Sequence, residues 1–398
     1  MAAGDRRRRI FVVAGEVSGD HQAARLIEAL RGERPGLEIV GAGGGRMAAA
    51  GARVLLDTTA WGVIGYAEAY VRLPVFALRY ARLVRLIERE RPDLLLLVDF
   101  PGMNRELAAR FGHKVRVVYY VPPQTYGRRT RSAARMAEAA VRLLAILPFE
   151  ADAYRRAGAD VVYVGHPAVD EAPPAHADRG SPDGDAGPAP RLARGPAPVV
   201  ALLPGSRLQE VRALLPPMLD AARRLAASRA ARFVLPLASP HLESVVTGRI
   251  AASGVPVRVA DGRAVETMAP AAVAVVASGT AAVEAACAGV PTVVVYRVSA
   301  LTAWIARRFV VTAELERTGF SIPSIVLGRP AVPELLQDAV TGPRIAQEVE
   351  RLLDPANAAR ARADLAEVRR RLGPPGAVAR AAREVLAALD SRATATIG

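Results

Sequence analysis

Short uninterrupted apolar runs recur along this chain, and each run is followed by a turn and then by a segment with helical spacing. In the first half these runs cover residues 10–14, 94–98, 115–119 and 161–164. Strands buried on both faces of a parallel sheet have this pattern, and crossover helices cover the two faces. The pattern therefore predicts an α/β domain over residues 1–170.

The pattern stops at residues 171–198, which consist mainly of Pro, Ala, Gly and Asp and predict a flexible linker. It then resumes and predicts a second α/β domain over residues 199–342, followed by helices over residues 343–398. Two doubly wound domains in tandem bind ligands at the carboxyl ends of their strands. The apolar runs of the second domain are residues 199–203, 232–237, 257–259, 272–276 and 292–296.

The charge and the rare residue types narrow the chemistry. The formal net charge is +14, and Lys114 is the single lysine, so a phosphate loop that needs a Gly-Lys pair does not exist. A basic surface suits an anionic membrane or phosphorylated substrates, and the chain contains no motif of a nucleic-acid reader. The single cysteine, Cys287, allows no disulfide framework and fits a reducing compartment.

The sequence predicts neither a membrane span nor a metal or other cofactor. The longest apolar stretch, residues 271–296, is interrupted by Ser278, Glu284 and Pro291, so we expect any membrane contact to be peripheral. No nucleophile elbow of the G-x-S-x-G type occurs. The histidines lie singly rather than in a metal-binding pattern, at His21, His113, His166, His176 and His241.

Two loops of the second domain have the features of phosphate sites. Ser278, Gly279 and Thr280 stand between a buried strand and a helix, where exposed N–H groups and the helix dipole attract an anion. Glu284, one turn later, is a candidate partner for ribose hydroxyls. The alternative is an ordinary capped helix whose glutamate is solvated.

The second of these loops contains Ser206 and Arg207 and follows the first strand of the domain. The planar, permanently charged guanidinium of Arg207 matches a diphosphate. The alternative is a solvated arginine, but a second anion loop on the same domain favours the binding site.

In the first domain, a polar loop follows the first strand. Its residues Glu16, Ser18 and Asp20 lie at the carboxyl edge of the predicted sheet. The glycine-rich residues 41–45 follow another strand and resemble a dinucleotide fingerprint, but Arg46 occupies the position of the third glycine, so that match fails.

Asp99 directly follows the buried strand of residues 94–98, where a desolvated carboxylate can act as a general base. Asn104 lies just after it, and His166 ends the last strand of the domain. A strand-terminal aspartate is also a common helix cap, and His166 can simply cap a turn. The residues alone do not decide between these roles of Asp99 and His166.

Taken together, these segments resemble the lipid-A-disaccharide synthase family over nearly the whole chain. Any one of these motifs is weak evidence for the family, whereas so many motifs in the same order along the chain are specific to it. The motifs are AGEVSGD (14–20), GAGGGRM (41–47), DFPGMN (99–104), YYVPPQ (119–124), LPFE (147–150), VGHP (164–167), LLPGSRLQEV (202–211), ASGTAAVEAA (277–286), PTVVVYR (291–297) and PELLQ (333–337).

The resemblance implies a GT-B fold, with a UDP-sugar donor on the second domain, an acylated acceptor on the first, and terminal helices that cross back to the first domain. It implies an inverting transfer of 2,3-diacylglucosamine from UDP to the 6-hydroxyl of 2,3-diacylglucosamine 1-phosphate (lipid X), without a catalytic metal. Asp99 matches the family's candidate base, and Glu16 is its rival. The family works in bacterial lipid A biosynthesis at the cytoplasmic face of the inner membrane.

The chain departs from the family's usual pattern at residues 122–127, at Gly102 and at residues 321–324, where Ser-Ile-Pro-Ser replaces Ser-Leu-Pro-Asn. An apolar segment flanked by arginines is a candidate membrane contact. Its residues are Tyr66, Tyr70, Leu73 and Phe76.

Two alternative functions share the predicted nucleotide site. One is another GT-B enzyme, either a transferase with a different acceptor or a UDP-GlcNAc 2-epimerase. A soluble epimerase, however, has no need of such an apolar segment. The other is a non-catalytic lipid- or nucleotide-binding relative, against which the presence of Asp99, Arg207 and Glu284 argues.

Overall fold

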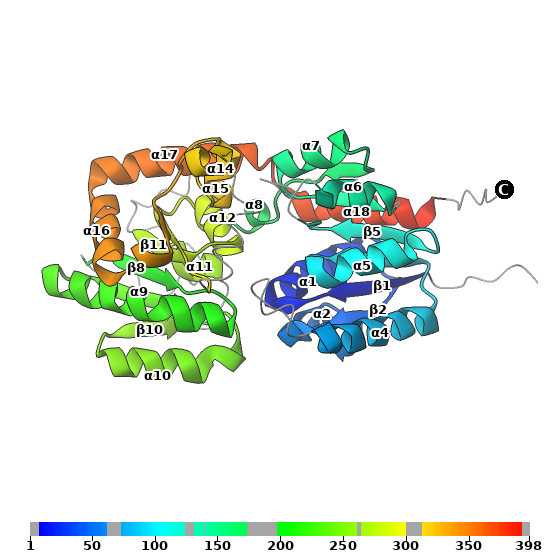
Figure 1. The fold of residues 1–398 in the computed structure, drawn as a ribbon, viewed down its shortest axis with the longest axis horizontal. Coiled ribbons are helices and arrows are strands. Elements are labelled where there is room, and N and C mark those ends of the chain that lie inside the picture. The colour runs from blue at the N-terminus through cyan, green and yellow to red at the C-terminus, as the bar shows by residue number, and fades with distance from the viewer. Residues whose placement is uncertain are drawn as a thin grey trace, which may run out of the picture. The chain divides into compact units, whose positions relative to one another are not determined.

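The computed structural model describes residues 8–61, 73–123, 131–139, 141–172, 197–260, 264–299 and 313–391. The chain divides into two compact units (Figure 1). The first combines residues 1–170 with residues 374–398, and the second comprises residues 171–373. Most of the predicted linker, residues 171–198, lies outside the described residues.

The first unit is built on a seven-stranded parallel sheet with the strand order β3-β2-β1-β4-β5-β6-β7. The apolar runs of the sequence predicted β1, β4, β5 and β7 within one or two residues. The strands are β1 (Arg9–Ala14), β2 (Glu38–Gly43), β3 (Arg53–Asp57), β4 (Leu94–Val98), β5 (Arg116–Tyr120), β6 (Arg142–Ala145) and β7 (Val161–Tyr163).

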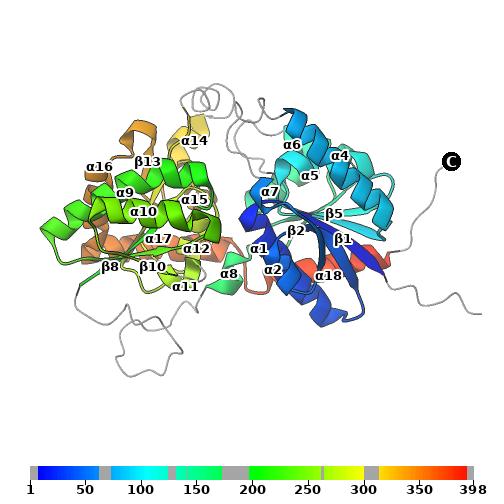
Figure 2. The same cartoon turned by 90° about the horizontal axis from the view of Figure 1, so that it is seen from below.

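Helices cover both faces of this sheet (Figure 2). One face carries α1 (Glu16–Glu33) and α18 (Ala377–Asp390), which pack against each other. Successive strand residues point to opposite faces, so Phe11 and Val13 of β1 join the core under the helices of the other face. That layer contains α4 (Leu73–Glu90), α5 (Pro101–Phe111), α6 (Arg131–Glu138) and α7 (Pro148–Arg156).

The carboxylate of Asp170 fixes the start of α18. It accepts hydrogen bonds from the backbone N–H groups of Gly376 (2.6 Å), Ala377 (3.2 Å) and Val378 (3.0 Å). A carboxylate satisfies the unpaired N–H groups of a helix start and complements its dipole. Among the predicted terminal helices, α18 therefore packs in the first unit, whereas α16 (Gly342–Leu353) and α17 (Pro355–Arg371) belong to the second. The remaining short helices of the first unit are α2 (Gly45–Ala49), η1 (Thr59–Trp61) and α8 (Ala168–Glu171).

The second unit contains a six-stranded parallel sheet with the order β10-β9-β8-β11-β12-β13. All strands except the short edge strand β13 were predicted from apolar runs. The strands are β8 (Val199–Leu203), β9 (Arg232–Pro236), β10 (Val257–Ala260), β11 (Val273–Ala277), β12 (Thr292–Tyr296) and β13 (Glu334–Leu336).

Helices again form a layer on each face. The layer of α9 (Leu208–Ser228), α10 (Glu243–Ser253) and α16 shares one apolar core with the sheet. The opposite layer contains α11 (Ala264–Met268), α12 (Thr280–Cys287), α15 (Ile322–Leu327) and α17. Both units are thus doubly wound α/β domains, as predicted. The remaining short helices are η3 (Pro240–Leu242), α14 (Ala313–Thr318) and η4 (Gln337–Ala339).

Two motif residues of the second unit are explained by the sheet itself. The side-chain amide of Gln337 accepts a hydrogen bond from the backbone N–H of Val298 (2.8 Å) and donates one to its carbonyl (3.1 Å). Arg297 donates to the carbonyls of Gln337 and Val340. These bonds continue the pairing of β12 and β13 beyond the strand ends. Within the part of the chain that is described, no helix is both long and apolar enough to cross a membrane.

Candidate functional site

Each sheet reverses its strand order at one place. In the first unit the chain runs outward from β1 through β2 to β3 and then returns to β4 on the other side of β1. In the second unit the same reversal lies between β8 and β11. Loops diverge at such a switch point, which is where open α/β sheets bind ligands.

The predicted residues of both domains follow the strands that flank these switch points. Ala14 pairs with Val98, so Glu16 and Asp99 leave the first sheet at the same edge. Leu203 pairs with Val276, so the loops that contain Arg207 and Ser278 leave the second sheet together. The structure therefore brings together the principal predicted residues of each domain.

The backbone is strained at the first switch point. Glu16, Asp99 and Phe100 all have positive φ angles, of 61°, 49° and 56°. A Cβ atom on Gly15 would lie 2.3 Å from the ring of Phe100, so only glycine fits between the two loops. Strain of this kind persists only where the surrounding structure enforces it, and it gathers at functional sites.

Three buried groups enforce the conformation of Asp99, which is itself half-buried. Its N–H donates to the carbonyl of Tyr120 (3.0 Å), and its carbonyl accepts from the Tyr119 hydroxyl (2.9 Å) and from Asn104 Nδ2 (2.8 Å). Asn104 is fully buried and also reaches the carbonyls of Val13 (3.3 Å) and Val98 (3.2 Å). The predicted cleft residue Asn104 thus lies beneath the turn and fixes the ends of β1 and β4.

Asp20 and Ser18 lie in the first turns of α1. Asp20 is buried, and its carboxylate accepts from the N–H groups of Gly44 (2.7 Å), Met47 (3.1 Å) and Arg46 (3.1 Å). These bonds cap the N-terminus of α2. A Cβ on Gly44 would lie 2.6 Å from Asp20 Oδ2, which explains one glycine of the 41–45 loop. Ser18 is half-buried.

His166 is buried as well. Its Nδ1 accepts a hydrogen bond from the N–H of Ala168 (3.1 Å), and its carbonyl accepts from Val169 (3.0 Å). The imidazole therefore caps the turn into α8, which is the alternative that the sequence left open.

Glu150 was not among the predicted site residues. It stands in the first turn of α7 with 2% of its surface exposed, and among the described residues its Oε1 has no hydrogen-bond partner. Burial, and secondly the negative charge of Asp99, raise the pKa of Glu150 well above its usual value. Glu150 ends the LPFE motif, but its burial could not be predicted, because glutamate in a first helical turn is normally solvated and favoured by the helix dipole.

In the second unit, the carboxylate of Glu210 organises the predicted diphosphate loop. It accepts from the N–H groups of Ser206 (3.2 Å) and Arg207 (3.3 Å), and from Arg207 Nη1 (3.1 Å). Gly205 has a φ of 108°, and a Cβ there would lie 2.3 Å from Glu210 Oε2. The loop is therefore held in one conformation, and Glu210 orients the Arg207 guanidinium.

The second anion loop joins β11 to α12. The N–H of Ser278 donates to the carbonyl of Val295 (3.0 Å), which anchors the loop to β12. Gly279 has a φ of 143° and open space where a Cβ would stand. Thr280, exposed, begins α12, and Glu284 is half-buried one turn later. The loop thus presents a helix start beside the Arg207 loop, as the sequence predicts.

The altered segment at residues 321–324 is part of the packing of α15. The hydroxyls of Ser321 and Ser324 each donate to Glu334 Oε1 (2.6 Å), and both serines are fully buried. Glu334 Oε2 also accepts from the N–H of Phe320 (2.7 Å). Ser324 therefore ties α15 to β13. Of the other altered segment, residues 124–127 lie outside the described residues.

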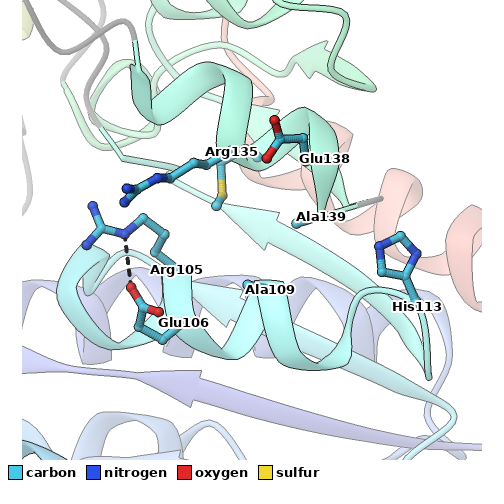
Figure 3. Close-up of a pocket in the computed structure, with 8 residues that line it drawn as sticks. Arg105, Glu106, Ala109, His113, Arg135, Glu138 and Ala139 are labelled. Carbon is cyan, nitrogen blue, oxygen red and sulfur yellow. Dashed lines mark hydrogen bonds and ion pairs between the residues drawn. The ribbon is translucent and has the colours of Figure 1, made fainter.

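A pocket lies between α5 and α6 in the first unit (Figure 3). Charged side chains of both signs line it, and Arg105 Nε contacts Glu106 Oε1 at 3.4 Å. The sequence predicted none of its lining residues as part of a site. The pocket is lined by Arg105, Glu106, Ala109, His113, Arg135, Met136, Glu138 and Ala139.

The arrangement of two doubly wound domains is shared with known GT-B proteins. The UDP-GlcNAc 2-epimerase from Neisseria meningitidis, solved bound to UDP-GlcNAc, superposes with a TM-score of 0.64 at 14% identity, covering 95% of this chain and all of that one. The calicheamicin glycosyltransferase CalG4 superposes with a TM-score of 0.58 at 20% identity, covering 98% of this chain and all of that one. The chain therefore has the GT-B fold.

Its sequence decides which GT-B family this is. Residues 10–386 match the family model described as lipid-A-disaccharide synthetase. The lipid-A-disaccharide synthase of Myxococcus xanthus is 42% identical over 382 residues, which cover 95% of this chain and 97% of that protein. The chain belongs to the lipid-A-disaccharide synthase family and is a glycosyltransferase of lipid A biosynthesis. The epimerase alternative rests on the fold alone.

The buried acid of Glu150 predicts a specific pH dependence of stability. In the unfolded chain its pKa is about 4.3, so above that pH folding must retain a proton that the unfolded chain has released. The free energy of unfolding of the parent protein should therefore fall as pH rises from there toward the folded pKa, with a slope of up to about 1.4 kcal/mol per pH unit. Glu150→Gln should remove this contribution.

Urea unfolding between pH 5 and pH 8 measures the effect. The advantage of Glu150→Gln over the parent should grow with pH. Glu243→Gln, which changes an exposed glutamate in the first turn of α10, is the matched control and should follow the parent. Parallel curves for all three proteins would show that Glu150 is ionised in the folded state.

Proposed function

We propose that this chain condenses UDP-2,3-diacylglucosamine with 2,3-diacylglucosamine 1-phosphate (lipid X) and releases UDP. The 6-hydroxyl oxygen of the acceptor attacks the anomeric carbon of the donor, the bond to the diphosphate breaks, and the hydroxyl proton passes to a base. Family membership supports the reaction. The observation that carries the assignment of residues is the placement of Asp99 and Arg207 beside the switch points of their sheets.

The second unit is assigned the UDP-sugar. Arg207 and the start of α12, with Ser206, Ser278, Gly279 and Thr280, face the diphosphate, and Glu284 takes the ribose hydroxyls. Glu210 already holds the Arg207 guanidinium in place, so little reorganisation accompanies binding. A fixed positive charge and a helix dipole stabilise the negative charge that develops on the departing UDP.

The first unit is assigned the acceptor, with Asp99 as the general base and Glu16 as the rival. Asp99 is half-buried, and Tyr119 and Asn104 fix its backbone and hence the direction in which its side chain leaves the turn. Asp20 and His166 shape this edge of the sheet through the turns that they cap, and Ser18 lies in the first turn of α1. A positioned base of this kind lowers the barrier of a single displacement.

The first unit is also assigned the contact with the cytoplasmic face of an anionic inner membrane. In α4, Leu78 is 73% exposed and Val75 is 43% exposed, and Arg82 and Arg85 are exposed one and two turns later. Exposed apolar side chains flanked by arginines are typical of peripheral binding to anionic lipid.

Of the four membrane-contact residues predicted from the sequence, the structure describes the side chain of Phe76 alone. Tyr66 and Tyr70 lie outside the described residues, and only the backbone of Leu73 is described. Phe76 is half-buried and stacks on Tyr80, with ring centroids 6.5 Å apart, so it is partly used in packing. The exposed pair Val75 and Leu78 therefore carries the proposal.

Asp99→Asn tests the base. Asparagine tolerates a positive φ, so the turn should keep its conformation while the proton acceptor is lost. We expect kcat to fall by about 10²- to 10⁴-fold, or roughly 3 to 5.5 kcal/mol, with UDP affinity unchanged. Release of UDP reports kcat. If Asp99→Asn stays active and Glu16→Gln abolishes turnover, Glu16 is the base.

Arg207→Ala tests the donor site. We expect UDP affinity to fall by about 1.5 to 3 kcal/mol, the usual contribution of a charge-assisted hydrogen bond, as measured by calorimetry. Arg212→Ala, an exposed arginine one turn later on α9, is the matched control and should bind UDP like the parent. Equal affinities of both variants would place the diphosphate elsewhere.

Sedimentation with vesicles tests the membrane surface. The double substitution Val75→Ser and Leu78→Ser should weaken binding to anionic vesicles, and added salt should weaken binding of the parent, because both apolar burial and charge contribute. Leu336→Ser, at a comparably exposed leucine of β13 in the second unit, is the control. Equal sedimentation of the double variant and the control would exclude this part of α4.

A further inference from the structure

Glu150 is a buried carboxyl group of the first unit that the proposed reaction does not use. It is 2% exposed, and its Oε1 has no hydrogen-bond partner among the described residues. A carboxylate left in this state would cost several kcal/mol of lost hydration, so a buried acid normally keeps its proton. Such a group stands out because most buried polar atoms of a folded protein are paired.

The topology places Glu150 and Asp99 at the same edge of the sheet. The strand that precedes α7, β6, pairs with β5, which pairs with β4, and Asp99 follows β4 directly. Tyr154, one turn after Glu150 on the same face of α7, donates its hydroxyl to the carbonyl of Pro123 (2.5 Å), just beyond β5. The inner face of α7 is therefore turned toward the segment that follows β5.

The charges around Glu150 do not offset its own. Asp99 is the described residue whose charge acts on Glu150, and it has the same sign. The other titratable side chains buried at this edge of the sheet are Tyr119, Tyr120, Tyr154 and His166. Of the cations on neighbouring elements, the half-buried Arg105 of α5 acts on the Tyr119 hydroxyl and also pairs with Glu106.

Two further arginines stand on the neighbouring elements β6 and α6. On β6, Arg142 pairs with Asp160 and Glu384, while Arg135 on α6 is exposed, as is Glu138 of the same helix. The charge of Asp99 acts on the buried carboxyl group of Glu150, so the protonation of the two groups is coupled.

We propose that Glu150 is a positioning residue that holds the single proton of an Asp99–Glu150 carboxyl pair and thereby sets the pH range in which Asp99 acts as the base. The inference rests on the proposed assignment of Asp99. While Glu150 is neutral, Asp99 feels no repulsion from it and stays ionised, ready to accept the proton of the acceptor hydroxyl.

Ionisation of Glu150 at alkaline pH has the opposite consequence. It places a second negative charge beside Asp99 in a dehydrated region and repels the negative charge that develops on the attacking oxygen. The kcat of the parent therefore falls at alkaline pH, in addition to the fall at acid pH when Asp99 is protonated.

The pH dependence of kcat for the full-length enzyme, followed by UDP release, tests this directly. Glu150→Gln mimics the neutral acid, so its plateau kcat should stay within about threefold of the parent, well short of the loss caused by a missing base. Its alkaline limb should disappear and its acid limb should not move. Glu150→Asp, which still ionises, should keep an alkaline limb.

Two results would overturn the proposal. A downward shift of the acid limb in Glu150→Gln would show that Glu150 is ionised at neutral pH. An unchanged alkaline limb would show that another group causes it. Asp99→Asn is measured first, and if it retains turnover, the base assignment fails before Glu150 is tested.

Infrared spectroscopy reads the proton without relying on turnover. The carbonyl stretch of a protonated carboxylic acid should be present in the parent at neutral pH and absent from Glu150→Gln. In Asp99→Asn the same band should disappear at a lower pH than in the parent, because the charge that opposes ionisation of Glu150 is gone. A band that is absent from the parent, or that titrates identically in Asp99→Asn, would overturn the coupling even if Asp99 proves to be the base.

Discussion

The in-register pairing of β1 with β4 is the constraint on which the first unit depends. Because Ala14 pairs with Val98, the two strands end together and their loops diverge from one point. Asn104 then joins the carbonyls of Val13, Val98 and Asp99 from below. A shift of one residue would turn every side chain of a strand to the opposite face, so the buried core protects the site's geometry.

The second unit repeats this construction with different chemistry. Leu203 pairs with Val276, and the two loops that follow offer N–H groups, a helix start and the Arg207 guanidinium. In the first unit the corresponding loops carry carboxylates. The same topology thus places groups that favour negative charge on one sheet and groups that accept a proton on the other. That division matches a transfer in which the leaving group gains negative charge and the attacking hydroxyl loses a proton.

Buried polar groups give the first site its rigidity. Tyr119, Asn104 and Glu150 are all buried, and the first two hold the backbone of Asp99 by hydrogen bonds. In a region of low dielectric such bonds are strong, and a group without a partner is costly. Burial, with the charge of Asp99, raises the pKa of Glu150, so the same dry environment that fixes the backbone of Asp99 also favours the neutral form of Glu150. Positive φ angles at Glu16, Asp99 and Phe100 persist because this packing enforces them.

The fold class, the family and the loops of the candidate site follow from the sequence alone, because doubly buried strands are continuous apolar runs and their ends mark where polar loops begin. The apolar runs did not predict the partly exposed edge strands β3 and β13, nor β6, where Arg142 interrupts the apolar residues 141–147. The contacts of individual polar residues, in contrast, follow only from the packing of the folded chain. Asp20 and His166 cap turns, Asn104 holds two strand ends, and Glu150 is buried near Asp99. These roles depend on contacts between segments far apart in the chain, which no local spacing of residues encodes.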